Sequence, residues 1–337
     1  MTDQEVEAKP ERKLRVMSGV RTTHHLHVGN YFGAIKNWIK LQHEYECYFG
    51  VMDLHGLTTA YKTPADVRMY NRDIFADLLA WGIDPDKNTL FIQSHIPEHV
   101  ELFMHFANLT PMGWLERVPT WKDAEEEARA SDTHNLGRFS YPVLQAADIA
   151  IYLGNLVPVG ADQVSHLELS REIIRRFNHL YKAKLPEPKH ILTEVPLLPG
   201  LDGRKMSKSY GNTLLLTEDE KTLKKKVNSM VTDSRRALRE NPGVPEDCTV
   251  YHFHKLYSTE ADLKWVVEGC TTAGIGCGDC KAKLCANIEE KTKIPREKKK
   301  ELLNNPERLD SIIAAGCEKA RTEASKNISA IKAWMKF

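Results

Sequence analysis

The chain holds 337 residues, 42% of them hydrophobic, and its formal net charge is +1. This length allows a large buried core and predicts two domains rather than one. The longest apolar runs are interrupted by polar side chains, and the charged N-terminus lacks a following apolar segment, which argues against a membrane-spanning or secreted protein and predicts a cytoplasmic one. Basic residues predominate after Gly203. This excess is compatible with a polyanionic partner and equally with a solvated surface.

Up to about residue 200, short apolar stretches alternate with amphipathic ones. Continuous short apolar runs are typical of buried parallel strands, and apolar residues at every third or fourth position are typical of helices. The alternation predicts an α/β fold with a Rossmann-like, doubly wound parallel sheet. The expected elements are a strand at 14–20, a helix at 31–45, a strand at 47–55, a helix at 66–82 and a strand at 89–96.

Beyond residue 215 the strand signal nearly disappears. Residues 218–231, 260–270 and 311–337 have helical spacing, which predicts a C-terminal all-helical domain. The join at 196–212 is rich in Pro, Gly and Lys, a composition typical of a mobile loop. The expected division is a flexible tail at 1–13, a Rossmann domain at 14–202, a mobile loop at 203–214 and a helical domain at 215–337.

The stretch TTHHLHVGN, residues 22–30, places three histidines just before the first predicted helix. Gly29 and Asn30 fall where this helix begins, and its free N–H groups and dipole favour a phosphate there. His27 could donate to such a phosphate. A metal site is disfavoured, because no HxxxH pair or Cys/His partner lies on a nearby helix. The residues alone leave phosphate binding and a surface turn open, and His25 is interpreted as incidental.

A second motif, GRKMSKSYGN at 203–212, places Lys205 and Lys208 three residues apart in a flexible context. Two such lysines suit a loop over a polyphosphate, although this motif alone describes a solvated basic loop as well. The ordered pair H-x-G-N at 27–30 and K-M-S-K-S at 205–209 resembles the two signatures of the class I aminoacyl-tRNA synthetases.

The resemblance covers about residues 14–335 and is closest to the tryptophanyl enzymes of the tryptophanyl/tyrosyl branch. It is carried by YPVLQAADIAIY at 141–152, VPVGADQVSHLELSREIIRRFN at 157–178 and VTDSRRALRENPGVPEDCTVYHFHKLYS at 231–258. It implies a ligase that activates L-tryptophan with ATP and Mg²⁺ and transfers it to tRNA(Trp). It also implies a homodimer, with 109–128 as a candidate interface, and a C-terminal domain that binds the anticodon.

Tyr141, Gln145 and Asp148 are spaced i, i+4 and i+7 and share one helix face. A buried acid needs a hydrogen-bond donor, and the resemblance implies that Asp148 accepts the indole N–H. Without the family, the three residues describe a polar rim that meets solvent. Tyrosyl enzymes share the Y-x₃-Q-x₂-D pattern, so tyrosine specificity stays open. His55 is a weaker pocket candidate that could equally be a satisfied strand-end histidine. The implied tryptophan-binding residues are Tyr141, Gln145, Asp148, Val157, Val159, Gln163 and His55.

For the nucleotide, the resemblance implies that His27 contacts the phosphates while Lys205 and Lys208 act on the leaving pyrophosphate. Lys208 is the foremost catalytic candidate, and Asp162 matches a position that handles the ATP ribose. The implied ATP-binding residues are Gly29, Asn30, Asp162, Lys205, Met206, Ser207, Lys208 and Ser209.

Two residues depart from the family pattern P-[ST]-G-x-x-H-x-G. Thr22 stands where proline is expected, and His24 stands where glycine is expected. Proline fixes φ and glycine permits close approach to a nucleotide, so both replacements affect the predicted ATP loop. They keep a second hypothesis open, in which the chain is a paralogue with a binding or regulatory role or an altered acceptor.

Five of the seven cysteines lie between residues 248 and 285, four of them in the pattern C-x₂₁-C-x₆-C-x₂-C. In a cytoplasmic protein this indicates a soft metal or a cluster rather than disulfides. Only one tight pair is present, and small neighbours suit an iron–sulfur site better than zinc. A similar subset of tryptophanyl enzymes, with a first spacing one residue longer, implies a [4Fe–4S] cluster here, with Zn²⁺ as the alternative. The implied ligands are Cys248, Cys270, Cys277 and Cys280.

The other three cysteines have different expected roles. Cys285 is the expected non-ligand, although it could replace Cys248. Cys47 and Cys317 are expected to fill cores.

Overall fold

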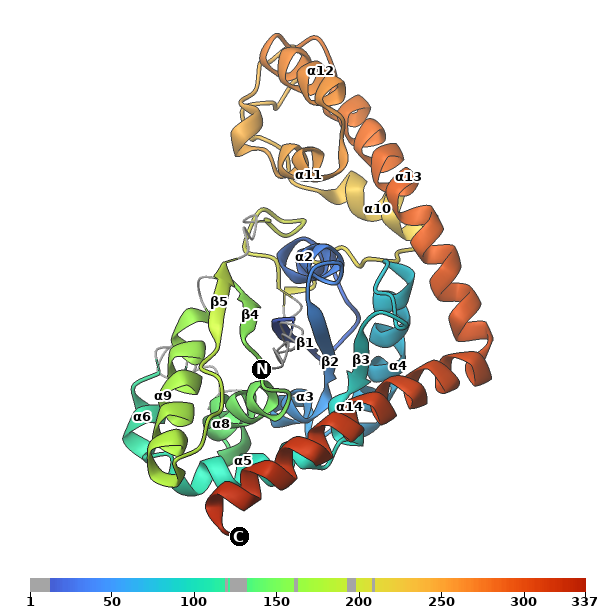
Figure 1. The fold of residues 1–337 in the computed structure, drawn as a ribbon. Coiled ribbons are helices and arrows are strands. Elements are labelled where there is room, and N and C mark those ends of the chain that lie inside the picture. The colour runs from blue at the N-terminus through green and yellow to red at the C-terminus, as the bar shows by residue number, and fades with distance from the viewer. Residues whose placement is uncertain (1–12, 119–120, 122–131, 161–162, 193–197, 208–209) are drawn as a thin grey trace, which may run out of the picture.

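The computed structural model describes residues 13–118, 121, 132–160, 163–192, 198–207 and 210–337. Its centre is a parallel five-stranded sheet in the order β3-β2-β1-β4-β5 (Figure 1). The order reverses between β1 and β4, which confirms the predicted Rossmann-like, doubly wound sheet. The strands are β1 Arg15–Arg21, β2 Glu46–Met52, β3 Thr89–Ile92, β4 Leu156–Val159 and β5 Lys189–Leu192.

Helices connect the strands, and two of them alter the predicted boundaries. The helix expected at 31–45 opens with one π-helical stretch and ends at Leu41, and the strand expected at 47–55 ends at Met52 because Asp53 begins a helix. The elements are α1 Val28–Asn30, a π-helix Tyr31–Ile35, α2 Lys36–Leu41, α3 Asp53–Ala60, α4 Pro64–Ala80, a 3₁₀ helix Gln93–His95, α5 Glu98–Leu109, α6 Met112–Glu116, α8 Leu136–Ile151 and α9 Val164–Tyr181.

The C-terminal part is helical throughout its described elements, as predicted. Most of it stands above the carboxyl ends of the strands, and α13 runs from there down the side of the molecule (Figure 1). The elements are α10 Glu220–Ser229, a 3₁₀ helix Pro245–Asp247, α11 Thr249–Tyr257, α12 Glu260–Thr271, α13 Cys277–Asn304 and α14 Pro306–Met335.

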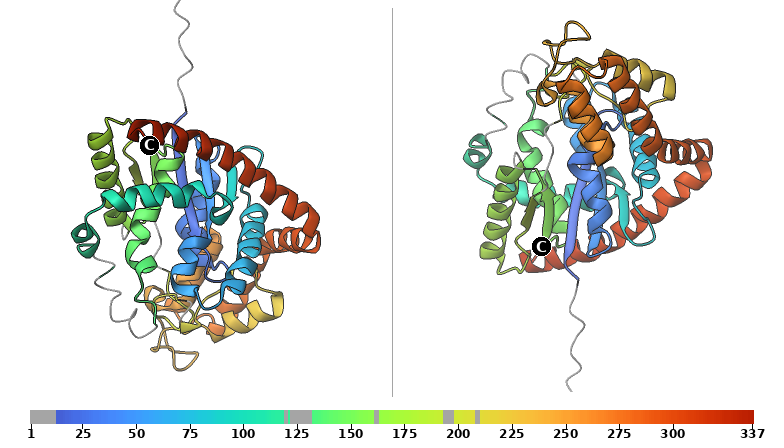
Figure 2. Two further views of the ribbon diagram at one scale, coloured as in Figure 1. Left: turned by 90° about the horizontal axis from the view of Figure 1, so that it is seen from below. Right: turned by 90° about the horizontal axis from the view of Figure 1, so that it is seen from above.

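The last helix, α14, returns to the sheet and packs against β3 and α5. It approaches β3 so closely that a Cβ on Gly316 would lie 2.0 Å from the carbonyl oxygen of Leu90. The thiol of the next residue, Cys317, accepts a hydrogen bond from the Ile92 backbone at 3.4 Å. Seen from below in Figure 2, α14 crosses the molecule from α13 to the C-terminus.

Polar contacts tie α14 to the start of β1 and the end of α8. Arg15 lies 2.7 Å from Glu323 and donates to the Tyr152 carbonyl at 2.9 Å. Asn327 donates to the Ile151 carbonyl at 2.7 Å. The C-terminal helix therefore shares the core of the sheet, while the expected division at residues 203 and 215 stays a prediction.

Within the described residues, no helix combines the length and apolarity that crossing a bilayer requires. Cys47 and Cys317 lie in the core, 1% and 7% exposed, as expected. Several predictions fall on residues outside the described ranges: the tail at 1–12, much of the candidate interface at 109–128, and the residues Asp162, Lys208 and Ser209.

Candidate functional site

A cavity of about 820 Å³ opens at the carboxyl ends of β1 and β4. The strand order reverses there, and open α/β sheets bind ligands at such a reversal. Residues of β1, β4, α8 and the π-helix form its wall. The sequence-predicted residues that line it are His55, Tyr141, Gln145, Asp148, Val157, Val159, Gln163 and Lys205.

Asp148 lines this cavity, and internal donors hold its carboxylate. The residue is only 2% exposed. Nε2 of His55 lies 2.7 Å from Oδ2, while Gln93 donates to Oδ1 at 2.8 Å and Nδ1 of His99 lies 2.6 Å from the same oxygen. A carboxylate offers about four lone-pair positions, so this arrangement leaves capacity for one further donor.

The same neighbours keep Asp148 ionised. Burial alone would raise its pKa, but the hydrogen bonds and charges of His55 and His99 hold the pKa of Asp148 well below its ordinary value. Nε2 of His99 in turn lies 2.8 Å from the hydroxyl of Tyr152, which fixes the ring from its other side. The cavity therefore presents a fixed anion to any ligand that reaches it.

Three side chains behind this cavity escaped the sequence predictions: Gln93, His99 and His166. The hydroxyl of Tyr141 lies 2.9 Å from Nδ1 of His166, which is fully buried in α9. Polar residues inside the segments at 89–96, 98–109 and 164–181 were the available signal. The sequence could not show what they face, because their partner Asp148 is 49 or more residues away from each of the first two.

Two guanidinium groups, those of Arg21 and Arg138, line the cavity as well. Nε of Arg21 donates to the His55 carbonyl at 3.0 Å. Burial, and then the nearby charge of Arg138, lower the pKa of Arg21. Two like charges in one wall favour an anionic ligand, because such a ligand relieves their repulsion.

The H-x-G-N motif forms the start of α1, as predicted. His27 is the residue before the helix, and its backbone N–H donates to Oδ1 of Asn30 at 3.0 Å. A Cβ on Gly29 would lie 3.0 Å from the His27 ring and 3.7 Å from the sulfur of Met206. The second signature therefore lies beside the first.

Backbone hydrogen bonds fix this juxtaposition. The N–H of Val28 donates to the Leu214 carbonyl at 2.9 Å, and the N–H of Leu216 donates to the Leu26 carbonyl at 3.0 Å. The segment after K-M-S-K-S is thus paired with the segment that leads into α1. Sequence spacing could not reveal this pairing across nearly 190 residues.

Asn212, 4% exposed, holds the loop that contains the second signature. Its Oδ1 accepts from the Ser207 backbone at 2.8 Å, and its Nδ2 donates to Asp202 at 2.7 Å and to the Lys205 carbonyl at 3.1 Å. A Cβ on Gly200 would lie 2.1 Å from this amide, so glycine is needed for the close approach.

Thr22 and His24, the two residues that depart from the family pattern, do not line the cavity as the sequence suggested. Thr22 is fully buried, whereas His24 is exposed, packs edge-on against Tyr70 and does not line the cavity. Its φ is not in the left-handed region, so this backbone does not demand glycine. His25, interpreted from the sequence as incidental, has a partner in the structure, because its Nδ1 lies 2.6 Å from Oδ2 of Asp73.

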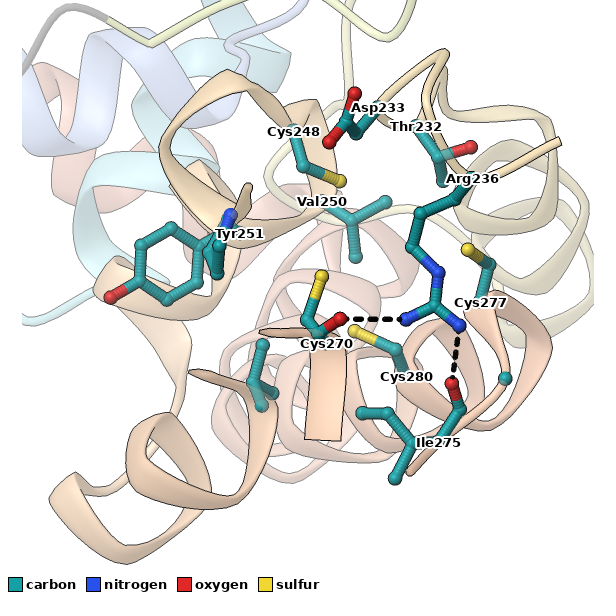
Figure 3. A pocket seen from close by; sticks show the side chains of 13 residues that line it. Thr232, Asp233, Arg236, Cys248, Val250, Tyr251, Cys270, Ile275, Cys277 and Cys280 are labelled. Carbon is teal, nitrogen blue, oxygen red and sulfur yellow. Dashed lines mark hydrogen bonds between the residues drawn. The ribbon is translucent and has the colours of Figure 1, made fainter. Parts of the chain in front are cut away.

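A second cavity lies in the C-terminal part and is lined by Cys248, Cys270, Cys277 and Cys280. Cys248 precedes α11, Cys270 lies near the end of α12, and the other two occupy the first turn of α13. Figure 3 shows these side chains around one space, together with Arg236. Cys285, the expected non-ligand, does not line it.

A guanidinium and an imidazole lie next to these thiols. Arg236 donates to the carbonyl oxygens of Ile275 at 2.7 Å and Cys270 at 3.3 Å. Nε2 of His254 lies 3.4 Å from the sulfur of Cys280. Burial, and then the three neighbouring cysteines, raise the pKa of the Cys280 thiol to about 12. Among the residues that the structure describes, no group of three or more His, Cys, Asp or Glu side chains is arranged for one metal ion.

Comparison with known protein families gives one match over most of the chain. Residues 9–292 match the family described as tRNA synthetases class I (W and Y). A tryptophan–tRNA ligase of Thermotoga maritima is 46% identical over 321 residues, which cover 95% of this chain and 98% of that protein. A tryptophan–tRNA ligase of Aquifex aeolicus is 39% identical, with 95% and 98% covered.

Solved structures give the same result. The chain is similar to the crystal structure of tryptophanyl-tRNA synthetase from Campylobacter jejuni complexed with ADP and tryptophan, with a TM-score of 0.88 and 35% identity. The match covers 96% of this chain and 100% of that one. A tyrosyl-tRNA synthetase of Archaeoglobus fulgidus, at 18% identity and a TM-score of 0.66, shares the fold.

Proposed function

Since this chain belongs to the class I tRNA synthetases of the tryptophan and tyrosine family and is a tryptophan–tRNA ligase, we propose that the cavity between β1 and β4 binds tryptophan and ATP next to each other. The observation that carries the proposal is that Asp148 and Lys205 line one cavity, while Met206, the residue after Lys205, lies beside Gly29 of α1.

The tryptophan side chain belongs at Asp148. An indole carries one N–H and no acceptor, so it matches a carboxylate that has capacity for one more donor. Val157 and Val159 line the same cavity and supply apolar contact for the ring, while Tyr141, Gln145 and Gln163 receive the amino-acid end. His55 holds the carboxylate in place from behind.

The nucleotide belongs at the other end, beside α1. His27, Gly29 and Asn30 present the start of a helix to the phosphates. Lys205 lines the cavity and Met206 lies beside Gly29, which supports a place for the second signature over the leaving pyrophosphate. The assignments of Ser207, Lys208 and Ser209 to ATP, and of Asp162 to its ribose, complete the proposal.

The reaction requires positioning and charge neutralisation rather than a covalent enzyme intermediate. The tryptophan carboxylate attacks the α-phosphorus of ATP, which arrives as its Mg²⁺ complex, and pyrophosphate leaves with both electrons of the broken P–O bond. Lys205, Lys208 and His27 neutralise that leaving group, and Arg21 and Arg138 add positive charge to the wall. A terminal ribose hydroxyl of tRNA(Trp) then attacks the activated carbonyl and releases AMP.

The four-cysteine cavity is the proposed site of a [4Fe–4S] cluster. Each thiolate of such a cluster binds a different iron, so its sulfurs spread more widely than the ligands of one Zn²⁺ ion. Zn²⁺ bound by the same four thiols is the alternative. When bound by Cys248, Cys270, Cys277 and Cys280, the cluster would link α11, α12 and α13 covalently.

The partners follow from the same proposal. The basic C-terminal part, with a lysine-rich α10, suits the phosphate backbone of tRNA(Trp). A homodimer through the segment at 109–128 remains part of the proposal.

The proposal is tested by tryptophan-dependent exchange of pyrophosphate into ATP, followed by charging of tRNA(Trp). We expect exchange with tryptophan to exceed exchange with tyrosine by about 100-fold or more, since a polar pocket strongly rejects a mismatched group. Exchange with neither amino acid, or equal exchange with both, would reject it.

A further inference from the structure

A buried lysine of the C-terminal part reaches the nucleotide end of the site. Nζ of Lys299, on α13, lies 2.9 Å from Oδ1 of Asp73 and 2.9 Å from Oδ2 of Asp77, both on α4. It also donates to the hydroxyl of Thr217 at 3.2 Å. Lys299 is 7% exposed and Asp77 is 1% exposed. Lys299 and Asp77 are therefore largely shielded from water, whereas Asp73 and Thr217 are half-buried.

The network continues into the loop before α1. The second oxygen of Asp73, Oδ2, lies 2.6 Å from Nδ1 of His25, and the His25 ring packs edge-on against Tyr70 at 4.9 Å. His25 is two residues before His27, which begins the nucleotide motif. Lys299 thus acts on one side of that motif through a single intervening carboxylate.

Through Thr217, the network also contacts the segment that follows the second signature. It follows directly after Leu216, whose N–H donates to the Leu26 carbonyl, in the segment that continues from K-M-S-K-S. The Thr217 hydroxyl donates to Asp77 at 3.4 Å in addition to its contact with Lys299. The cluster therefore holds both chain segments that place the two signatures against each other.

Buried ion pairs are costly to form and stabilise a fold poorly, but they define one arrangement when every partner is satisfied. Here the Lys299 ammonium contacts two carboxylates of α4. Asp73 also contacts His25, before the first signature, and Asp77 accepts from Thr217, after the second. We infer that Lys299, with Asp73 and His25, positions the nucleotide-binding loop, so that the α13 helix sets the affinity for ATP. This inference rests on the proposed function of the neighbouring site.

A merely structural role makes a different prediction from a positioning role. Loss of folded protein lowers kcat and leaves both KM values unchanged. Displacement of the nucleotide loop raises KM for ATP, whereas the proposed tryptophan-binding residues of α8 line the cavity between β1 and β4. The KM values for ATP and tryptophan therefore separate the two roles.

The test is pyrophosphate exchange by the full chain with Lys299→Met, which keeps the apolar stem and removes the charge. We expect KM for ATP to rise about tenfold, the size of one lost charged hydrogen bond, with KM for tryptophan changed less than about twofold. Lys300→Met is the matched control, because the neighbouring lysine is exposed and forms no ion pair with either carboxylate among the described contacts.

A second variant keeps the test valid if Lys299→Met fails to fold. His25→Phe retains a ring against Tyr70 and removes the bond to Asp73 at a side chain that is 42% exposed. It should raise KM for ATP about threefold, in the same direction. An unchanged KM for ATP in the folded variants, or an equal rise for tryptophan, would overturn the inference. Absence of exchange in the unaltered protein would reject the proposed function instead.

Discussion

Oδ2 of Asp148 lies 2.7 Å from Nε2 of His55, so this acid in the cavity wall is fixed before any ligand enters. With His99 and Gln93 on its other oxygen, the carboxylate cannot turn away from the cavity. Such prearranged polar groups give a binding site its selectivity, because a ligand that lacks the matching donor leaves them unsatisfied.

Replacement of this acid tests the assignment. Asp148→Asn should raise KM for tryptophan by about 10- to 100-fold, because the amide loses the charge and turns an N–H₂ group toward existing donors. Exchange kinetics at varied tryptophan measure it. Asp53→Asn is the control, since Asp53 is also a buried carboxylate with internal partners but does not line the cavity. The assignment is wrong if the two variants have the same KM.

The second prediction concerns the pH dependence of stability. Burial raises the pKa of Asp77 to about 7 despite the charge of Lys299. The unfolded chain releases this proton near its ordinary pKa of about 3.9, whereas the folded chain keeps it until about pH 7. The raised pKa of Asp77 therefore adds its full contribution to the free energy of unfolding below about pH 4. This contribution is lost as the pH rises toward 7, by at most about 1.4 kcal/mol per pH unit.

Asp77→Asn removes this titration. Denaturant unfolding of both proteins at about pH 5, 6 and 7 should show a stability that declines more steeply with pH in the unaltered protein. Parallel curves would show that Asp77 does not titrate in this interval.

The third prediction compares two histidines three residues apart. His24→Gly restores the family residue, but His24 is exposed and outside the cavity, so KM for ATP should stay within about twofold. His27→Ala removes a residue at the start of α1 and should lower kcat/KM for ATP by about 100-fold. A large effect of His24→Gly together with a small effect of His27→Ala would reverse our assignment.

The fourth prediction concerns the cysteines. We expect the unaltered protein to contain iron and acid-labile sulfide and to be brown, and we expect Cys280→Ser to lose all three properties. Cys285→Ser, on the same helix but outside the cavity, should retain them. Bound zinc without sulfide in the unaltered protein would replace the cluster proposal, and equal loss in both variants would show that Cys285 is also needed.

Regular spacing explains which parts of the site were predictable. Tyr141, Gln145 and Asp148 reach one cavity because i, i+4 and i+7 fall on one helix face, and Gly29 and Asn30 begin a helix where the polarity pattern changes. The alternation of strands and helices likewise predicted the parallel sheet.

Contacts between distant segments explain what was missed. The role of His25 depends on Asp73 and Lys299, 48 and 274 residues farther along the chain, and no local pattern records such partners. His99 escaped for the same reason. The return of α14 to the sheet was also hidden, because its helical spacing is the same whichever surface it packs against.

That return has a consequence for how the chain folds. Arg15 and Glu323 are separated by 308 residues, yet their side chains meet across the first strand and the last helix. Contacts of this range slow folding, because the loop they close must be ordered before they contribute. During synthesis, the sheet formed by the N-terminal residues must wait with its β3 surface uncovered until α14 leaves the ribosome, so the nascent chain exposes an apolar surface through most of translation.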